Sequence, residues 1–165
     1  MKDLILKEAQ KKEIEFWKNS DLERPGVKHL PTVLEKMSMG KTLLKCLKLS
    51  KIKLNRNTKI LELGAGQGWA SCILKNLFPH TEITTTDISI HALESLKEWE
   101  ERMEVEIDKC YECESYKTKE GKESIDFVFT FASAHHFINH DETIKEISRV
   151  LKPKGNAAYF FEPVS

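Results

Sequence analysis

Three glycines occupy alternate positions in the stretch I-L-E-L-G-A-G-Q-G: Gly64, Gly66 and Gly68, directly after an apolar run. A glycine-rich turn between a strand and a helix brings backbone N–H groups and a helix N-terminus close to a ligand. The nicotinamide-binding fingerprint G-x-G-x-x-G places its third glycine one residue further along. The turn therefore predicts a nucleotide-like ligand and disfavours a nicotinamide cofactor.

Two carboxyl groups and two histidines accompany this turn. Glu62 lies two residues before the first glycine, and Asp87 follows the stretch E-I-T-T-T, where a ribose-binding carboxylate is expected. His135 and His136 follow a second apolar run, and a histidine can accept a substrate proton because its unperturbed pKa is about 6.5. The alternative for each histidine is a hydrogen-bonded wall residue, and for each carboxyl group a structural role.

The elements that must position these residues alternate between strands and helices from Lys59 onward. Apolar or β-branched stretches predict strands at 59–63, 82–86, 104–108, 125–131 and 157–161. Helices are predicted at 3–18, 31–49, 68–77, 90–102 and 141–151, with Ser89 as an N-cap, turns at Pro25-Gly26 and K-P-K-G, and a polar loop over 110–124. Strands joined by helices form parallel sheets covered on both faces, so we predict a doubly wound α/β fold.

Four motifs in this order resemble those of the class I S-adenosylmethionine-dependent methyltransferases. They are L-E-L-G-A-G-Q-G, T-T-T-D-I-S-I-H-A-L, I-D-F-V-F-T-F-A-S-A-H-H-F and E-I-S-R-V-L-K-P-K-G, all within residues 59–162. The resemblance implies a Rossmann-like, mainly parallel five-stranded sheet of order 3-2-1-4-5. It also implies one domain with two parts, an N-terminal helical cap (residues 1–58) and a cofactor-binding core (residues 59–165).

The resemblance further implies which residues bind S-adenosylmethionine, the cofactor of the family. Glu62 would meet the methionine ammonium, Asp87 the ribose hydroxyls and Ile88 one face of the adenine. Other members of the site would be Gly64, Ala65, Gly66, Gly68, Phe131 and, near the adenine amino group, Glu112. The winding of the sheet reverses between strands one and four, so His136 and His135 would lie near the transferable methyl group as candidate catalytic bases.

The implied activity is that of a methyltransferase of EC 2.1.1 type with an unidentified acceptor. The motif N/D-P-P-Y/F, typical of enzymes that methylate base or amide nitrogens, is replaced by F-A-S-A-H-H. This favours a small-molecule acceptor and leaves nucleic-acid and protein acceptors open. The alternative is a non-catalytic cofactor-binding or scaffolding module. Family members add two strands after strand five, so we expect the chain, which stops at E-P-V-S, to be a fragment.

The motifs C-x-x-C at 110–113 and H-x-x-x-H at 136–140 raise the question of zinc. The 22 residues between the two pairs exceed the spacing of zinc fingers. With strand three placed three strands from strand four, the pairs lie about 14 Å apart at ~4.8 Å per strand, against zinc–ligand distances of ~2.0–2.3 Å. No metal site is predicted, and the cysteines are expected to be reduced thiols.

Charge is unevenly distributed along a chain of zero net charge. Residues 1–58 contain 14 Lys or Arg against 7 Asp or Glu, and residues 59–165 contain 12 against 19. Either the basic segment meets an anionic partner or the two parts attract each other. No apolar run approaches the ~20 residues of a membrane span, and M-K-D-L-I-L-K-E lacks the pattern of a secretory signal. The predicted location is the cytoplasm, without a membrane partner; the oligomeric state is left open.

Overall fold

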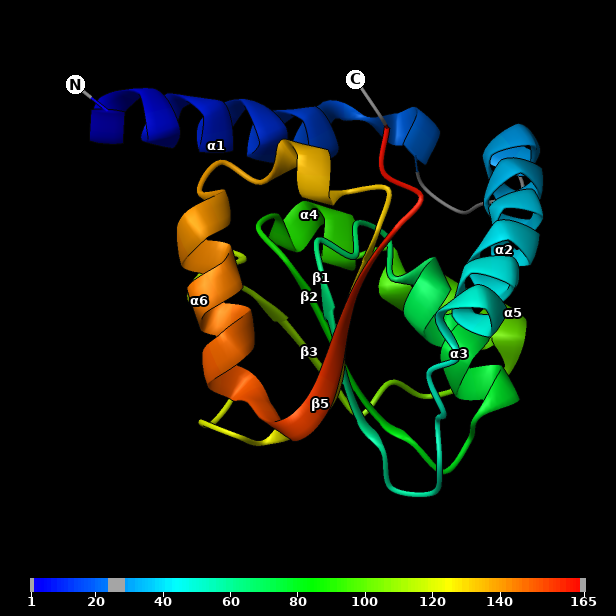
Figure 1. The fold of residues 1–165 in the computed structure, drawn as a ribbon. Helices are drawn as coiled ribbons and strands as arrows, with labels where there is room; N and C mark the ends of the chain where they lie inside the picture. The colour runs from blue at the N-terminus through cyan, green and yellow to red at the C-terminus, as the bar shows by residue number, and fades with distance from the viewer. Residues whose placement is uncertain (1, 24–28, 164–165) are drawn as a thin grey trace.

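A five-stranded sheet forms the centre of the protein (Figure 1), whose computed structural model describes residues 2–23 and 29–163. The strands are β1 (Lys59–Leu63), β2 (Glu82–Asp87), β3 (Lys109–Glu112), β4 (Ile125–Phe131) and β5 (Leu151–Phe160). They pair in the order β3-β2-β1-β4-β5, and every neighbouring pair is parallel. The predicted fold class and strand order are confirmed.

Side chains of the central strands alternate between the two faces of the sheet. Ile60 of β1 belongs to one core cluster together with Phe127 and Phe129 of β4, whereas Leu61 and Val128 belong to the other. All five side chains are buried. Burial on both faces is what a parallel sheet with helical connections requires, and it explains the nearly continuous apolar runs of these strands.

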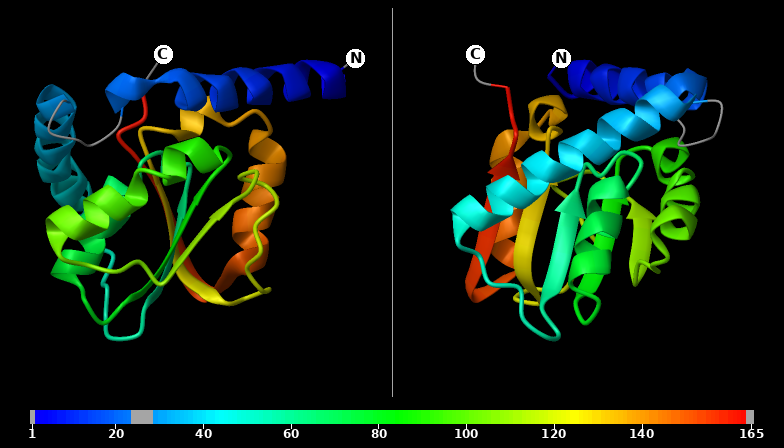
Figure 2. Two further views of the ribbon diagram at one scale, coloured as in Figure 1. Left: turned by 180° about the vertical axis from the view of Figure 1, so that it is seen from behind. Right: turned by 90° about the vertical axis from the view of Figure 1, so that its right-hand side faces the viewer.

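Helices cover both faces of the sheet (Figures 1 and 2). The first core cluster is completed by α2 (Leu30–Ser50), α3 (Trp69–Leu77) and α5 (Leu96–Met103), and the second by α6 (His140–Val150). Pro31 lies in the first turn of α2, as predicted. Because α2 buries Val33, Leu43 and Leu47 in the first core cluster, part of the segment 1–58 belongs to the same hydrophobic core as the strands.

Four short or peripheral elements gather at the carboxyl ends of the strands. The long helix α1 (Lys2–Asn19) crosses above this edge, with η1 (Asp21–Glu23) after it (Figure 1). Beneath α1 lie α4 (Ile90–Leu93) and η3 (Ala134–His136) (Figures 1 and 2). No helix among the described residues is long and apolar enough to cross a membrane.

The predicted third strand at 104–108 is wrong, since β3 begins at Lys109. Glu104 ends α5 in the left-handed conformation (φ 53°), so the chain is still leaving the helix at this point. The Asp108 carboxylate accepts hydrogen bonds from the Ile83 N–H (2.8 Å) and from Lys75 Nζ (2.7 Å). Asp108 thus holds the start of β2 through its side chain, and parallel pairing with β2 begins one residue later, with Thr84 opposite Lys109.

Two further predictions differ from the structure. The predicted helix 90–102 is divided into α4 and α5, and Ser89 precedes α4 without making a side-chain capping hydrogen bond. The predicted K-P-K-G turn lies inside β5 as an irregularity, because the register jumps from Ile125 opposite Leu151 to Phe127 opposite Asn156. The predicted turn at Pro25-Gly26 lies outside the described residues.

Candidate active site

A cavity of about 570 Å³ lies between α1 and the carboxyl ends of the strands. Its walls come from segments far apart in the sequence: α1, the glycine turn, the end of β2, the loop after β3, and the loop after β4. The predicted site residues that line it are Gly64, Ala65, Gly66, Asp87, Ile88, Phe131 and His136. The volume falls in the range of ~300–1,000 Å³ that is usual for small-ligand sites.

The glycine turn requires glycine at its first two positions. Gly64 and Gly66 have φ of 67° and 55°, in the left-handed region that disfavours a side chain. A Cβ atom at Gly64 would lie 2.8 Å from Ser133 Oγ and 2.9 Å from the Phe137 ring, and one at Gly66 would lie 3.2 Å from the Trp17 ring. The turn is therefore shaped by close approach of the loop after β4 and of α1, and its backbone faces the cavity.

Gly68 has a different function in the structure. It caps the start of α3 with φ 78°, and a Cβ atom there would lie 2.6 Å from Leu96 Cδ1. It does not line the cavity. The third glycine of the motif therefore allows α3 to pack closely against α5.

Asp87 links the glycine turn to the second strand. Its Oδ2 accepts a hydrogen bond from the Gly66 N–H (2.8 Å), and its Oδ1 accepts one from the Ser89 N–H (2.9 Å). Burial raises the pKa of this carboxyl group to about 6, even though both hydrogen bonds act in the opposite direction. Asp87 therefore places a carboxylate at the cavity wall whose hydrogen bonds to water are replaced by two from backbone N–H groups. Its oxygens can accept further hydrogen bonds from a ligand.

Glu62 lies beneath the glycine turn and does not line the cavity. Its side chain is buried and accepts a hydrogen bond from the Ser71 hydroxyl of α3. Burial raises the pKa of Glu62 to about 8, so the neutral acid is the main form at pH 7. The Glu62 side chain therefore connects β1 to α3. It does not lie in the cavity, where the resemblance had placed it beside the ligand.

The adenine end of the predicted site is formed by residues just after Glu112. The Glu112 side chain is exposed and outside the cavity lining, whereas Cys113, Glu114 and Tyr116 line it. Side chains alternate along a strand, so the last residue of β3 points away from the cavity while the chain beyond it turns inward. The Cys113 N–H fixes this turn by donating to the Asp87 carbonyl oxygen (2.8 Å).

The two adjacent histidines have different environments. His136 lines the cavity, and its Nδ1 lies 3.6 Å from Glu13 Oε2 on α1. His135 does not line it, and its Nδ1 lies 2.9 Å from Glu162 Oε2. The same Glu162 carboxylate accepts hydrogen bonds from the backbone N–H groups of Ser133 and Ala134 (both 3.0 Å), so His135 belongs to a cluster that fixes the loop after β4.

Residues of α1 are the part of the site that the sequence did not reveal. Gln10 Nε2 donates to Glu114 Oε1 and to the Tyr116 hydroxyl, both at 3.1 Å, across more than 100 residues of sequence. Trp17 Nε1 donates to Glu13 Oε1 (3.2 Å). All five line the cavity, so α1 forms its roof. The aromatic pair Phe16-Trp17 near the end of a highly charged helix is the sequence feature that could have indicated this contact.

Within the described segments, no group of three or more His, Cys, Asp or Glu side chains is arranged to hold a metal ion. The four cysteines are free thiols, and burial raises the pKa of Cys113 to about 11. Thiols with raised pKa values are poor nucleophiles and poor metal ligands at neutral pH.

Comparison with known families identifies the class of protein. A sequence model described as a methyltransferase domain matches residues 61–159, more than half of the chain, so the chain belongs to this methyltransferase-domain family. The methyltransferase family predicted from the motifs is confirmed. No curated protein sequence matches the chain.

Solved structures share the fold. The PH0226 protein from Pyrococcus horikoshii OT3 is 26% identical with a TM-score of 0.67, covering 77% of this chain and 54% of its own. The YcgJ protein from Bacillus subtilis is 21% identical with a TM-score of 0.63, covering 72% and 49%. Geranyl diphosphate C-methyltransferase from Streptomyces coelicolor A3(2), solved with Mg²⁺, geranyl diphosphate and S-adenosylhomocysteine, is 14% identical with a TM-score of 0.68, covering 92% and 63%. The last two share the fold alone, and the chain spans between 49% and 63% of the three structures' lengths.

Proposed function

We propose that the cavity under α1 binds S-adenosylmethionine and that the chain transfers its methyl group to a small-molecule acceptor. The observation that carries this proposal is the meeting of the glycine turn, the Asp87 carboxylate and the His136 imidazole in a single cavity. These groups come from β1, β2 and the loop after β4, on the two sides of the point where the winding of the sheet reverses.

The residues present fit the cofactor. Gly64 and Gly66 line the cavity with backbone, because neither residue carries a side chain. Asp87 supplies a carboxylate for ribose hydroxyls. If a ligand hydroxyl replaced the Gly66 N–H as a donor, Asp87 would still accept two hydrogen bonds. Phe131, whose ring packs edge-on against Trp69 (5.3 Å between centroids), and Ile88 supply apolar surface.

S-adenosylmethionine supplies an activated methyl group on a sulfonium, which is already a good leaving group. The chain therefore contributes chiefly alignment, proximity and exclusion of water. The glycine turn and Asp87 fix one end of the site, and the loop after β4 faces it from the neighbouring strand. The α1 roof, with Trp17 against Gly66, covers one side of the cavity.

His136 is the candidate base for an acceptor that loses a proton. It lines the cavity, and the nearby Glu13 carboxylate can stabilise the imidazolium that results from proton transfer. His135 is the matched comparison, because it is the adjacent residue of the same type and lies outside the cavity.

A small acceptor is favoured by the size of the cavity, about 570 Å³, and by α1, which covers one side of it (Figure 1). Transfer from isotopically labelled S-adenosylmethionine to pools of small metabolites, RNA and protein tests this choice directly. Label in the small-molecule pool supports the proposal, and label only in RNA or protein contradicts it. Binding of S-adenosylhomocysteine without transfer to any pool would instead support a non-catalytic cofactor-binding module.

With an acceptor in hand, His136→Gln and His135→Gln separate the roles of the two histidines. Loss of a positioned base costs about 10²–10⁴-fold in rate, and we expect this for His136→Gln alone. Both variants should still bind S-adenosylhomocysteine. Equal rates for the two variants would remove His136 from the mechanism.

A further inference from the structure

A second hollow, of about 440 Å³, lies at the amino ends of the strands. Its walls are the segment before β1 (Ile52 to Thr58), the start of β4 and the irregular start of β5 (Lys152 to Asn156). These segments lie at the end of the sheet opposite α1 (Figure 1). The full length of the strands separates this hollow from the cavity under α1, and the hollow has no part in the proposed methyl transfer.

The hollow is strongly basic. Its lining contains the cations Lys53, Arg56, Lys152 and Lys154 and a single carboxylate, Asp126, which gives a balance of +3 in a chain of zero net charge. The side chains of Asn55, Asn57 and Asn156 add neutral amide donors.

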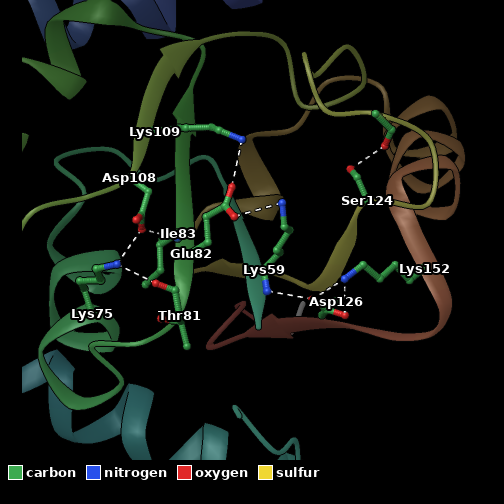
Figure 3. Close-up of polar contacts among 11 residues, drawn as sticks. Lys59, Lys75, Thr81, Glu82, Ile83, Asp108, Lys109, Ser124, Asp126 and Lys152 are labelled. Carbon is green, nitrogen blue, oxygen red and sulfur yellow. Dashed lines mark hydrogen bonds and ion pairs between the residues drawn. The ribbon is translucent and has the colours of Figure 1, made fainter. Parts of the chain in front are cut away.

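The single carboxylate is already engaged. Asp126 Oδ2 accepts a hydrogen bond from the Lys59 N–H (2.9 Å), and Lys152 Nζ lies 2.9 and 2.8 Å from the two carboxylate oxygens (Figure 3). Lys53, Arg56 and Lys154 take part in no ion pair with a carboxylate of the described residues. Three cations therefore face the hollow without a protein counter-charge.

The basic character does not continue along the edge of the sheet. Beside the hollow, Glu82 is paired with Lys59 (3.0 Å) and Lys109 (3.1 Å), and Asp108 is paired with Lys75 (2.7 Å), as Figure 3 shows. A nucleic acid needs a continuous row of cations for successive phosphates, and the alternation of carboxylates with lysines breaks such a row. The concentrated charge suits a compact anion instead.

We propose that this hollow is a binding site for a small ligand carrying phosphoryl groups, with a charge close to that of a diphosphate. Arg56 can bind two phosphoryl oxygens at once, and Lys53 and Lys154 supply point charges from the two sides. The volume suits a small molecule. The site is independent of the proposed methyl transfer, so its test needs no methylation assay.

Calorimetric titration with inorganic diphosphate tests the site. We expect saturable binding with one ligand per chain, weakened about tenfold or more by Arg56→Ala and by Lys154→Ala, because each removes a charge-assisted hydrogen bond. Lys41→Ala and Lys45→Ala are the matched controls, since both lysines are exposed on α2 outside the hollow and should leave the affinity unchanged.

Several results would overturn the proposal. One is the absence of saturable diphosphate binding, and another is that the variants of the hollow and the control variants weaken this binding equally. A third is that a single-stranded RNA oligonucleotide binds more tightly than diphosphate at the same ionic strength. All four substituted side chains are exposed, so the variants should fold, which circular dichroism can verify. Titration of the same variants with S-adenosylhomocysteine should give wild-type affinity, which separates failure of this site from failure of the cofactor cavity.

Discussion

The pKa values of carboxyl groups are shifted in opposite directions at the two ends of the sheet. At the carboxyl ends, Glu62 and Asp87 are buried and form no ion pair with a cation of the described residues, and burial raises their pKa values to about 8 and about 6. At the amino ends, hydrogen bonds from Lys59 and Lys109 lower the pKa of Glu82. Burial raises the pKa of Asp126, but the hydrogen bonds from the Lys152 ammonium outweigh this effect, so the pKa of Asp126 is lowered as well.

This difference separates the edge with the proposed cofactor site from the edge with surface ion pairs. Asp87 is a buried carboxyl group with a raised pKa at the cavity wall, which is typical of ligand-binding sites, and Glu62 lies beneath it as a mainly neutral acid. The exposed lysine–carboxylate pairs at the amino ends contribute little free energy. The amino end departs from this pattern only at the basic hollow, where cations outnumber carboxylates. The comparison can be tested by matched substitutions at the two ends.

The largest expected effect concerns Glu62 and the pH dependence of stability. Its folded pKa is raised, so the folded state binds more protons than the unfolded state between pH ~4.5 and ~8, and the free energy of unfolding falls as pH rises. This amounts to about 1.3 kcal/mol between pH 6 and 7 and about 1 kcal/mol between pH 7 and 8, where the group approaches half protonation, out of roughly 4 kcal/mol between pH ~4.5 and ~8. Urea unfolding should show this fall in the wild type and its absence in Glu62→Gln.

Glu82→Gln is the control at the other end of the sheet. The folded pKa of Glu82 is lowered, so its stabilisation is present above the unfolded pKa and is lost as pH falls through the folded pKa. Between pH 6 and 8 this variant should keep the wild-type slope. A wild-type stability that is constant over this range would contradict the placement of Glu62.

Cofactor affinity should distinguish Asp87 from Asp126. Asp87→Asn should weaken S-adenosylhomocysteine binding by about 1.5–3 kcal/mol, because a charged hydrogen-bond acceptor at the cavity is lost. Asp126→Asn, at the opposite end, should bind as the wild type does. Calorimetry gives both values, and equal affinities in the two variants would remove Asp87 from the site.

A smaller effect is expected from the α1 roof. Trp17→Ala removes the ring that lies above Gly66 and should weaken S-adenosylhomocysteine binding by about 1–2 kcal/mol through lost apolar contact. Lys11→Ala, an exposed position of α1 outside the cavity lining, should have no effect. If both variants bind as the wild type does, α1 does not cover the bound ligand.

The smallest expected effect is that of an exposed ion pair. Glu82→Ala removes the pairs with Lys59 and Lys109, and since all three side chains are partly exposed, we expect a loss of about 0.5 kcal/mol or less in the free energy of unfolding. The loss should shrink further at high salt. A loss of several kcal/mol, measured by urea unfolding, would mean that the amino end is more than a set of surface pairs.

Much of the fold was predictable because the central strands have only one interpretation. β1 and β4 have the predicted bounds, since continuous apolar runs of this length fit buried parallel strands. The prediction of the third strand was wrong because the sequence K-C-Y-E of β3 is mostly exposed, and because its position depends on pairing with β2, which no local pattern encodes.

The candidate site also contains residues that local sequence predicted and residues whose positions depend on distant contacts. The glycine turn and Asp87 lie at the cavity as predicted, because a turn after β1 and the end of β2 are adjacent in any sheet of this order. Glu112 and His135 lie outside the cavity because local alternation and a contact with Glu162 turn them away. The sequence predicted a helical cap, but it could not show that Gln10 of α1 contacts Glu114 and Tyr116, because these contacts cross more than 100 residues of sequence.

The most direct test of the central claim is calorimetric titration of the wild-type chain with S-adenosylhomocysteine. The account predicts saturable binding of one ligand per chain, weakened in Asp87→Asn and unchanged in Asp126→Asn. Absence of binding at millimolar ligand by a protein that circular dichroism shows to be folded would contradict it.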